Sequence, residues 1–204
     1  MTAVTATLAA LVAVPSALIG GLGRLSPFRP VRLLAGAYIE VFRGTSAIVQ
    51  LFWVFYVLPE LGITLDPLTA GVIVLGLNSG AYGAEVVRGA IKAVPRGQWE
   101  AATALRLNRP LRMALVVLPQ AVPTMIPPFG NLFIDLLKGT SLLSLITVTD
   151  ATTVINNLGV NGTVQFQQAY PLLLGIYFAM SLPIVALTRG AERRARRHLP
   201  KIRR

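Results

Sequence analysis

The 204-residue sequence contains no cysteine and a single histidine, His198. Without cysteine the chain can form neither a disulfide nor a thiolate-ligated metal site. It also lacks the GxxxxGKS or GxxxxGKT pattern of a phosphate-binding loop, so we do not expect it to hydrolyse ATP itself. An enzyme embedded in a membrane would need histidine, cysteine or paired carboxylates within its apolar stretches, and none is present there. We therefore expect no catalytic residue, no metal and no cofactor.

Charged residues are scarce. They make up 13% of the chain and hydrophobic residues 54%, whereas soluble domains average about 25% charged residues. The net charge of +11 would favour nucleic-acid binding in a soluble protein. Here the basic residues gather in loops and at the C-terminus, as the positive-inside rule requires. The chain is therefore expected to lie in a lipid bilayer and not to bind nucleic acid.

Apolar stretches predict an all-α, polytopic membrane protein with about five transmembrane helices, because a bilayer requires ~20 apolar residues per helix. The expected spans cover residues 2–23, 35–58, 68–87, 113–137 and 170–187. Gly20, Gly21 and Gly23 allow the first span to contact a neighbour closely. We expect a short helix within 141–154, re-entrant or lying on the outer surface, and an outer loop over 156–168. Residues 1–188 thus form one transmembrane domain.

Basic residues indicate the orientation of these spans. The loop 88–112 holds six bases against one acid, and the tail 189–204 holds eight against one. With the N-terminus outside and the C-terminus inside, Lys138 alone among the 19 Lys and Arg residues falls toward the outer side. We therefore expect a multi-pass plasma-membrane protein with a cytoplasmic 88–112 loop and a basic cytoplasmic tail.

Two groups of polar residues interrupt the spans at helical spacing, so each group shares one helix face. They are Asn78, Tyr82 and Glu85 in the third span, and Asn131, Asp135 and Lys138 in the fourth. An Asp or Lys at the centre of a span costs ~2.5–3.5 kcal/mol to insert, so we expect Asp135 and Lys138 to be paired, placed toward the outer edge of the membrane, or both. One interpretation is a pathway for a polar solute. The alternative is structural pairing of Asp135 with Lys138, and of Glu85 with Arg88.

Several motifs resemble the permease subunits of bacterial ABC importers. Gly97-Gln98-Trp99-Glu100-Ala101-Ala102, followed by Leu118-Pro119, resembles their EAA loop. Four further motifs resemble the branch of this family that transports polar amino acids. They are Phe42-Arg43-Gly44-Thr45, Val49-Gln50-Leu51-Phe52, Leu77-Asn78-Ser79-Gly80-Ala81-Tyr82 and Leu137-Lys138-Gly139-Thr140-Ser141-Leu142. The resemblance implies a type I importer transmembrane domain in a bacterial plasma membrane. It further implies three partners: a cytoplasmic ATP-binding subunit, a second permease subunit and an extracellular solute-binding protein. The implied solute is a polar amino acid, or a related zwitterion such as ectoine.

The resemblance to the EAA loop implies that one short segment couples this chain to the ATPase. Its residues are Gly97, Gln98, Trp99, Glu100, Ala101, Ala102, Ala104, Leu105 and Arg106. The alanines make a slim helix that can enter a groove on a partner, and Trp99 and Leu105 can serve as buried anchors. The alternative is an amphipathic loop that lies on anionic lipid headgroups.

Arg106 departs from the family pattern, which usually has glycine at this position. Glycine adopts positive φ at no steric cost and arginine does not. We therefore expect the docking helix to form but its exit turn to differ from that of relatives, with Asn108 able to take the left-handed conformation two residues later.

The alternative function is a secondary transporter or channel driven by an ion gradient. Such proteins often contain internal repeats. The sequence contains no convincing repeat, which favours the ABC permease.

Overall fold

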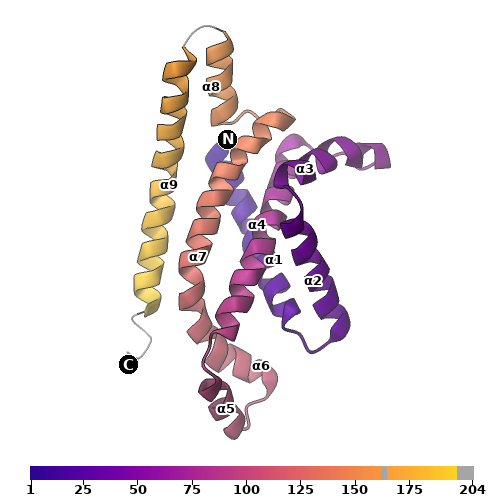
Figure 1. Cartoon of the computed structure of the whole chain (residues 1–204), viewed down its shortest axis with the longest axis vertical. Coiled ribbons are helices and arrows are strands. Elements are labelled where there is room, and N and C mark those ends of the chain that lie inside the picture. The colour runs from indigo at the N-terminus through magenta and orange to yellow at the C-terminus, as the bar shows by residue number, and fades with distance from the viewer. Residues whose placement is uncertain (162–164, 197–204) are drawn as a thin grey trace.

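The computed structural model describes residues 1–161 and 165–196, and its regular structure throughout these ranges is helical (Figure 1). The α-helices are α1 (Thr2–Arg24), α2 (Arg29–Gly44), α3 (Ala47–Phe52), α4 (Pro67–Lys92), α5 (Arg96–Ala104), α6 (Arg109–Arg112), α7 (Leu118–Gly139), α8 (Ala151–Val160) and α9 (Phe166–Arg196). π-helical segments occupy Trp53–Val57 and Met113–Val117, and 3₁₀ segments occupy Leu58–Leu61 and Thr140–Ile146. The predicted all-α class is confirmed.

Within the described ranges, four helical segments are long and apolar enough to cross a membrane. They are Thr2–Arg24, Pro67–Lys92, Arg109–Ile146 and Phe166–Ala195. The pair Arg29–Gly44 and Ala47–Leu61 adds a fifth if it counts as one span. This range of four to five agrees with the predicted polytopic class.

The expected second span, 35–58, is not one straight helix. α2 and the helical segment that begins with α3 meet at 104°. Thr45, directly after α2, has φ −120° and ψ 155°, an extended conformation that ends the helix. The apolar content of 35–58 concealed this break, because hydropathy does not register a change in helix direction.

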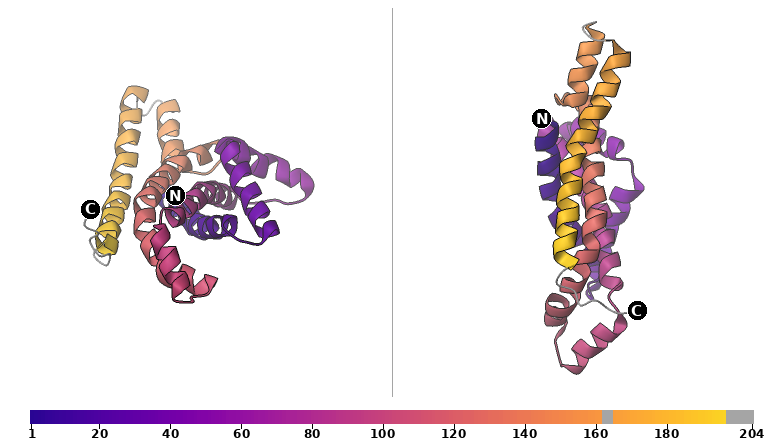
Figure 2. Two further views of the ribbon diagram at one scale, coloured as in Figure 1. Left: turned by 60° about the horizontal axis from the view of Figure 1, so that its bottom comes forward. Right: turned by 90° about the vertical axis from the view of Figure 1, so that its left-hand side faces the viewer.

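α1 and α4 pack against each other along their length and form the centre of the molecule (Figures 1 and 2). The buried side chains of α1 are small and recur every four residues, at Ala9, Ala13 and Ala17. A methyl group added at Gly21 would lie 2.7 Å from the carbonyl oxygen of Ala84 on α4. Only glycine therefore fits at this contact, and the close approach predicted for Gly21 is confirmed.

The remaining helices flank this central pair. Figure 2 shows α8 and α9 at one edge and α2 and α3 at the opposite edge, with α7 beside α9. α5 and α6 lie together at one end of the molecule, while α8 and the N-terminus lie at the other (Figure 1). The hydroxyl of Thr2 accepts a hydrogen bond from the Ala151 N–H at 3.1 Å. That bond ties the start of α1 to the start of α8.

The segment after α7 differs from the expected short helix followed by a loop. A 3₁₀ segment covers Thr140–Ile146, and α8 then continues to Val160, inside the loop expected over 156–168. The carboxylate of Asp150 accepts the Thr153 N–H at 2.8 Å and so caps the start of α8. Residues 162–164 lie outside the described residues.

Candidate functional site

One face of α5 is held against the ends of the spans. Ala102 is buried, and Trp99 packs against a buried cluster that includes Ile91 of α4. The side-chain amide of Gln120 donates to Gln98 Oε1 at 3.0 Å. Since Gln120 belongs to α7, these contacts join α5 to both α4 and α7.

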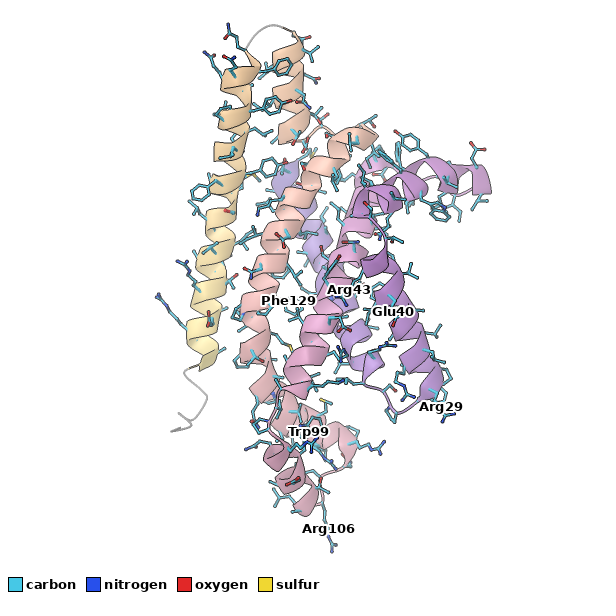
Figure 3. All side chains as sticks on the ribbon, in the orientation of Figure 1. Arg29, Glu40, Arg43, Trp99, Arg106 and Phe129 are labelled. Carbon is cyan, nitrogen blue, oxygen red and sulfur yellow. The ribbon has the colours of Figure 1, made fainter. Side chains whose placement is uncertain are left out.

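The opposite face of α5 is open. Its exposed residues include Gly97, Glu100, Ala101, Thr103 and Ala104, followed by Leu105 and Arg106. Leu105 is 74% exposed, an unusual position for a large apolar side chain on a charged segment. Figure 3 shows Trp99 beside the body of the molecule and Arg106 pointing away from it. Of the two expected anchors, Leu105 is thus available to a partner, whereas Trp99 anchors α5 within the chain.

α5 ends in a turn that places Arg106 in the left-handed conformation, with φ 54°. The Arg106 N–H donates to the Thr103 carbonyl at 2.9 Å, and the Leu107 N–H donates to the Ala102 carbonyl at 3.1 Å. These two bonds make up a Schellman motif, which usually has glycine at the left-handed position. The tight exit turn is therefore kept, with a steric cost of roughly 1 kcal/mol for the side chain.

Asn108 does not take the left-handed conformation that we expected of it. Its φ is −66° and its ψ 164°, and its side-chain oxygen accepts the Leu111 N–H at 3.0 Å. The prediction was wrong because Asn108 caps the N-terminus of α6, a role that its short polar side chain also suits.

Asn78, on α4, stabilises the break between α2 and α3 through hydrogen bonds. Its amide donates to the Phe42 carbonyl at 3.0 Å and to Gln50 Oε1 at 3.1 Å. The amide of Gln50 in turn donates to Phe42 O at 3.0 Å and to Thr45 Oγ1 at 2.7 Å. A helix break frees carbonyl groups, which need partners in hydrocarbon. Gln50 was not among the predicted site residues, although a lone amide inside an apolar run signals such a role.

Tyr82 and Glu85, further along α4, contact basic side chains. The Arg43 guanidinium lies 5.3 Å from the centroid of the Tyr82 ring, a cation–π distance. Arg88 Nε donates to both carboxylate oxygens of Glu85 at 3.0 Å. The Glu85–Arg88 ion pair of the structural alternative is therefore present.

Glu85 also lines a charged cavity of about 420 Å³ between α1, α2 and α4. Arg24 pairs with Glu40 there at 2.8 Å. The lining of this cavity contains four basic and two acidic residues. It comprises Arg24, Ile39, Glu40, Arg43, Glu85, Arg88 and Lys92.

Asn131, Asp135 and Lys138 are all exposed on one face of α7. Lys138 Nζ lies 4.0 Å from Asp135 Oδ1, with the two side chains 65% and 71% exposed. Such an open pair contributes at most about 1 kcal/mol in water, and in hydrocarbon the exposed charges would be strongly unfavourable. This face therefore needs water or another protein chain over it. The α4 residues contact α2, so the described chain does not gather all six polar residues into one site.

Comparison with known proteins identifies the family to which this chain belongs. A profile of binding-protein-dependent transport system inner membrane components matches residues 10–203. The chain belongs to this family. It is similar to the probable amino-acid ABC transporter permease y4tF of Sinorhizobium fredii, with 46% identity over 178 residues, 84% of this chain and 74% of that protein. It is also similar to the L-cystine transport system permease TcyB of Bacillus subtilis, with 38% identity over 185 residues, 91% of this chain and 79% of that protein.

Solved structures agree with this family. The crystal structure of an amino acid ABC transporter with histidines superimposes with a TM-score of 0.87 and 36% identity, covering 95% of this chain and 90% of that chain. An inward-facing methionine transporter, MetNI, shares the fold with a TM-score of 0.75 at 18% identity, covering 96% of this chain and 91% of that chain. The protein is thus a multi-pass inner-membrane permease subunit of an ABC importer. No finding favours the alternative of an ion-gradient-driven transporter or channel.

Proposed function

We propose that this permease imports a polar amino acid or a similar zwitterion, using energy that a separate cytoplasmic ATPase delivers through α5. The observation that carries the proposal is the two-sided placement of α5. Its inner face is tied to α4 and α7 by Trp99 and by the Gln98–Gln120 hydrogen bond. Its outer face, with Ala104 and Leu105, is open at the end of the molecule. A force on that outer face would move both spans.

The end that carries α5 and α6 is the cytoplasmic one in this proposal. Bases are concentrated there, in the turn after α1 and in the 88–112 segment. The positive-inside rule supports this orientation. It puts the N-terminus and α8 outside, where an extracellular solute-binding protein would deliver the solute. The family description as binding-protein-dependent supports that partner.

The solute pathway follows the polar face of α7 in this proposal. Asp135 and Lys138 offer one charge of each sign, as a zwitterion requires, and Asn131 offers an amide. Asn78, Tyr82 and Glu85 support the pathway from α4, where Asn78 and Tyr82 contact the bent second span and Glu85 pairs with Arg88. A second permease subunit, identical or related, would cover the exposed α7 face and enclose the pathway. The relatives named for amino acids and for cystine support an amino-acid solute.

Co-isolation of the ATPase subunit tests the coupling role. Ala104→Arg places a large charged side chain on the outer face of α5, and we expect it to reduce the co-isolated ATPase at least tenfold. Ala93→Arg is the matched control, since Ala93 is also exposed but lies at the end of α4. Equal recovery of the ATPase with both variants would contradict the proposal.

A further inference from the structure

A second cavity lies beside the α5–α6 segment. It has a volume of about 550 Å³ and lies between the turn after α1, the end of α4, and the α5–α6 segment. One part of its wall is apolar, with Leu25, Ile91, Trp99 and Met113. The cavity therefore offers room and an apolar surface where three spans end.

The rest of the wall is strongly basic. Arg32, Lys92, Arg109 and Arg112 all line the cavity, and no acidic residue lines it. Near this cavity, Arg24 pairs with Glu40 and Arg88 pairs with Glu85. Four cations around one cavity repel one another unless an anion lies between them.

Two of these guanidinium groups are held in place without being neutralised. Arg32 donates to the Ser26 carbonyl at 3.3 Å, and Arg112 donates to the Leu107 carbonyl at 3.2 Å. In addition, Nε of Arg112 is buried and has no acceptor among the described residues. A buried donor without an acceptor is unfavourable. Arg32 and Arg112 are thus oriented by neutral carbonyls, and none of the four bases forms an ion pair with an acidic residue among the described residues.

We propose that this cavity binds the headgroup of an anionic phospholipid. Its phosphodiester would lie against the four bases, and the glycerol and first acyl carbons would lie on the apolar wall. The position of the cavity along the membrane normal suits a lipid headgroup. The spans α1 and α4 end beside it, at Arg24 and Lys92, so the cavity lies at the level of lipid headgroups. Basic pockets between helices at this level bind anionic lipids, and tryptophan favours the same layer. A free anion would leave the apolar wall uncovered.

The lipid would also contact the α5–α6 segment, whose α5 part couples to the ATPase in the proposed function. Trp99 comes from α5, and Arg109 and Arg112 come from α6. A bound headgroup would bridge these residues to Arg32 and Lys92, which belong to α2 and α4. Anionic lipid would therefore hold the α5–α6 segment against the ends of the spans.

Lipid binding to the purified, delipidated full chain in detergent tests this site by native mass spectrometry. The probes are phosphatidylglycerol, phosphatidylcholine with the same acyl chains, and glycerol phosphate without acyl chains. We expect phosphatidylglycerol to bind most tightly. Arg32→Gln and Arg109→Gln should each weaken it about fivefold, as loss of one basic contact predicts. Arg29→Gln is the matched control, because Arg29 carries the same charge three residues away on α2 and does not line the cavity.

Four results would overturn the inference. An equal loss in Arg29→Gln would show a general surface attraction. Equal binding of phosphatidylcholine would remove the role of the negative charge, and equal binding of glycerol phosphate would show a site for a free anion. Displacement of phosphatidylglycerol by the ATPase subunit would show that the bases receive acidic side chains of that partner.

Discussion

At the scale of single residues, Arg106 holds a backbone conformation that glycine adopts more readily. Its φ of 54° completes the Schellman motif at the end of α5. We predict that Arg106→Gly raises the free energy of unfolding by about 1 kcal/mol, because the steric penalty of a side chain in this conformation disappears. Arg106→Val should lower it, since a β-branched side chain is poorly tolerated there.

Thermal unfolding of the purified protein measures both changes. Ala101→Gly serves as the control, because Ala101 is exposed in the interior of α5, where glycine costs roughly 1 kcal/mol relative to alanine. A loss of stability in Arg106→Gly equal to that in Ala101→Gly would show that the turn is not strained.

The paired charges on α7 make a second prediction. If Asp135 and Lys138 contact the solute, Asp135→Asn and Lys138→Met should each reduce uptake into proteoliposomes at least tenfold, equivalent to about 1.4 kcal/mol. The double exchange Asp135→Lys with Lys138→Asp separates this role from structural pairing. A purely structural pair would be restored by the exchange, and uptake would recover. Recovery would therefore contradict the pathway role.

Residue roles were only partly predictable from the sequence. The spacing correctly put Asn131, Asp135 and Lys138 on one face of α7, since that follows from helix geometry alone. It could not show that Trp99 points into the chain while Leu105 points out, because that depends on how α5 meets α4 and α7.

At the scale of elements, the bend of the second span depends on a small polar network. We predict that Asn78→Ala lowers the free energy of unfolding by about 1–3 kcal/mol, because it removes both hydrogen bonds of the Asn78 amide. Ser79→Ala, at the next position, should change the free energy of unfolding by less than about 0.5 kcal/mol.

The double variant of Gln50→Ala and Asn78→Ala tests whether the two amides act together. Its loss of stability should be smaller than the sum of the two single losses, because both amides donate to the Phe42 carbonyl. Denaturant or thermal unfolding measures each value, and additive losses would contradict a shared network.

The same network explains which elements the sequence could predict. Hydropathy located the apolar stretches, because their length is set by the bilayer. It missed the 104° bend, because the partner that makes the break tolerable, Asn78, lies far along the chain from Phe42. The full length of α8 was likewise not predicted. Asn156 and Asn157 are typical of loops, and Asp150 was not recognised as the N-cap of this helix.

At the scale of the whole molecule, one chain leaves much apolar surface uncovered. α9 buries almost none of its apolar window within the chain, and α1 and α7 bury only a minority of theirs. Lipid suits the apolar faces, whereas the polar face of α7 requires protein or water. A permease that is complete only with a paired subunit is consistent with both observations.

The most direct test of the central claim is a crosslink from the outer face of α5 to the ATPase subunit. Because the sequence has no cysteine, Leu105→Cys supplies the only thiol of the permease for a reagent that joins cysteine to lysine. In the reconstituted importer, Leu105→Cys is predicted to give a product containing both subunits, with a yield that changes on addition of ATP. Ala102→Cys, at a position only 2% exposed, should give none. If Leu105→Cys yields no such product while the same complex hydrolyses ATP and imports solute, energy does not reach this permease through α5.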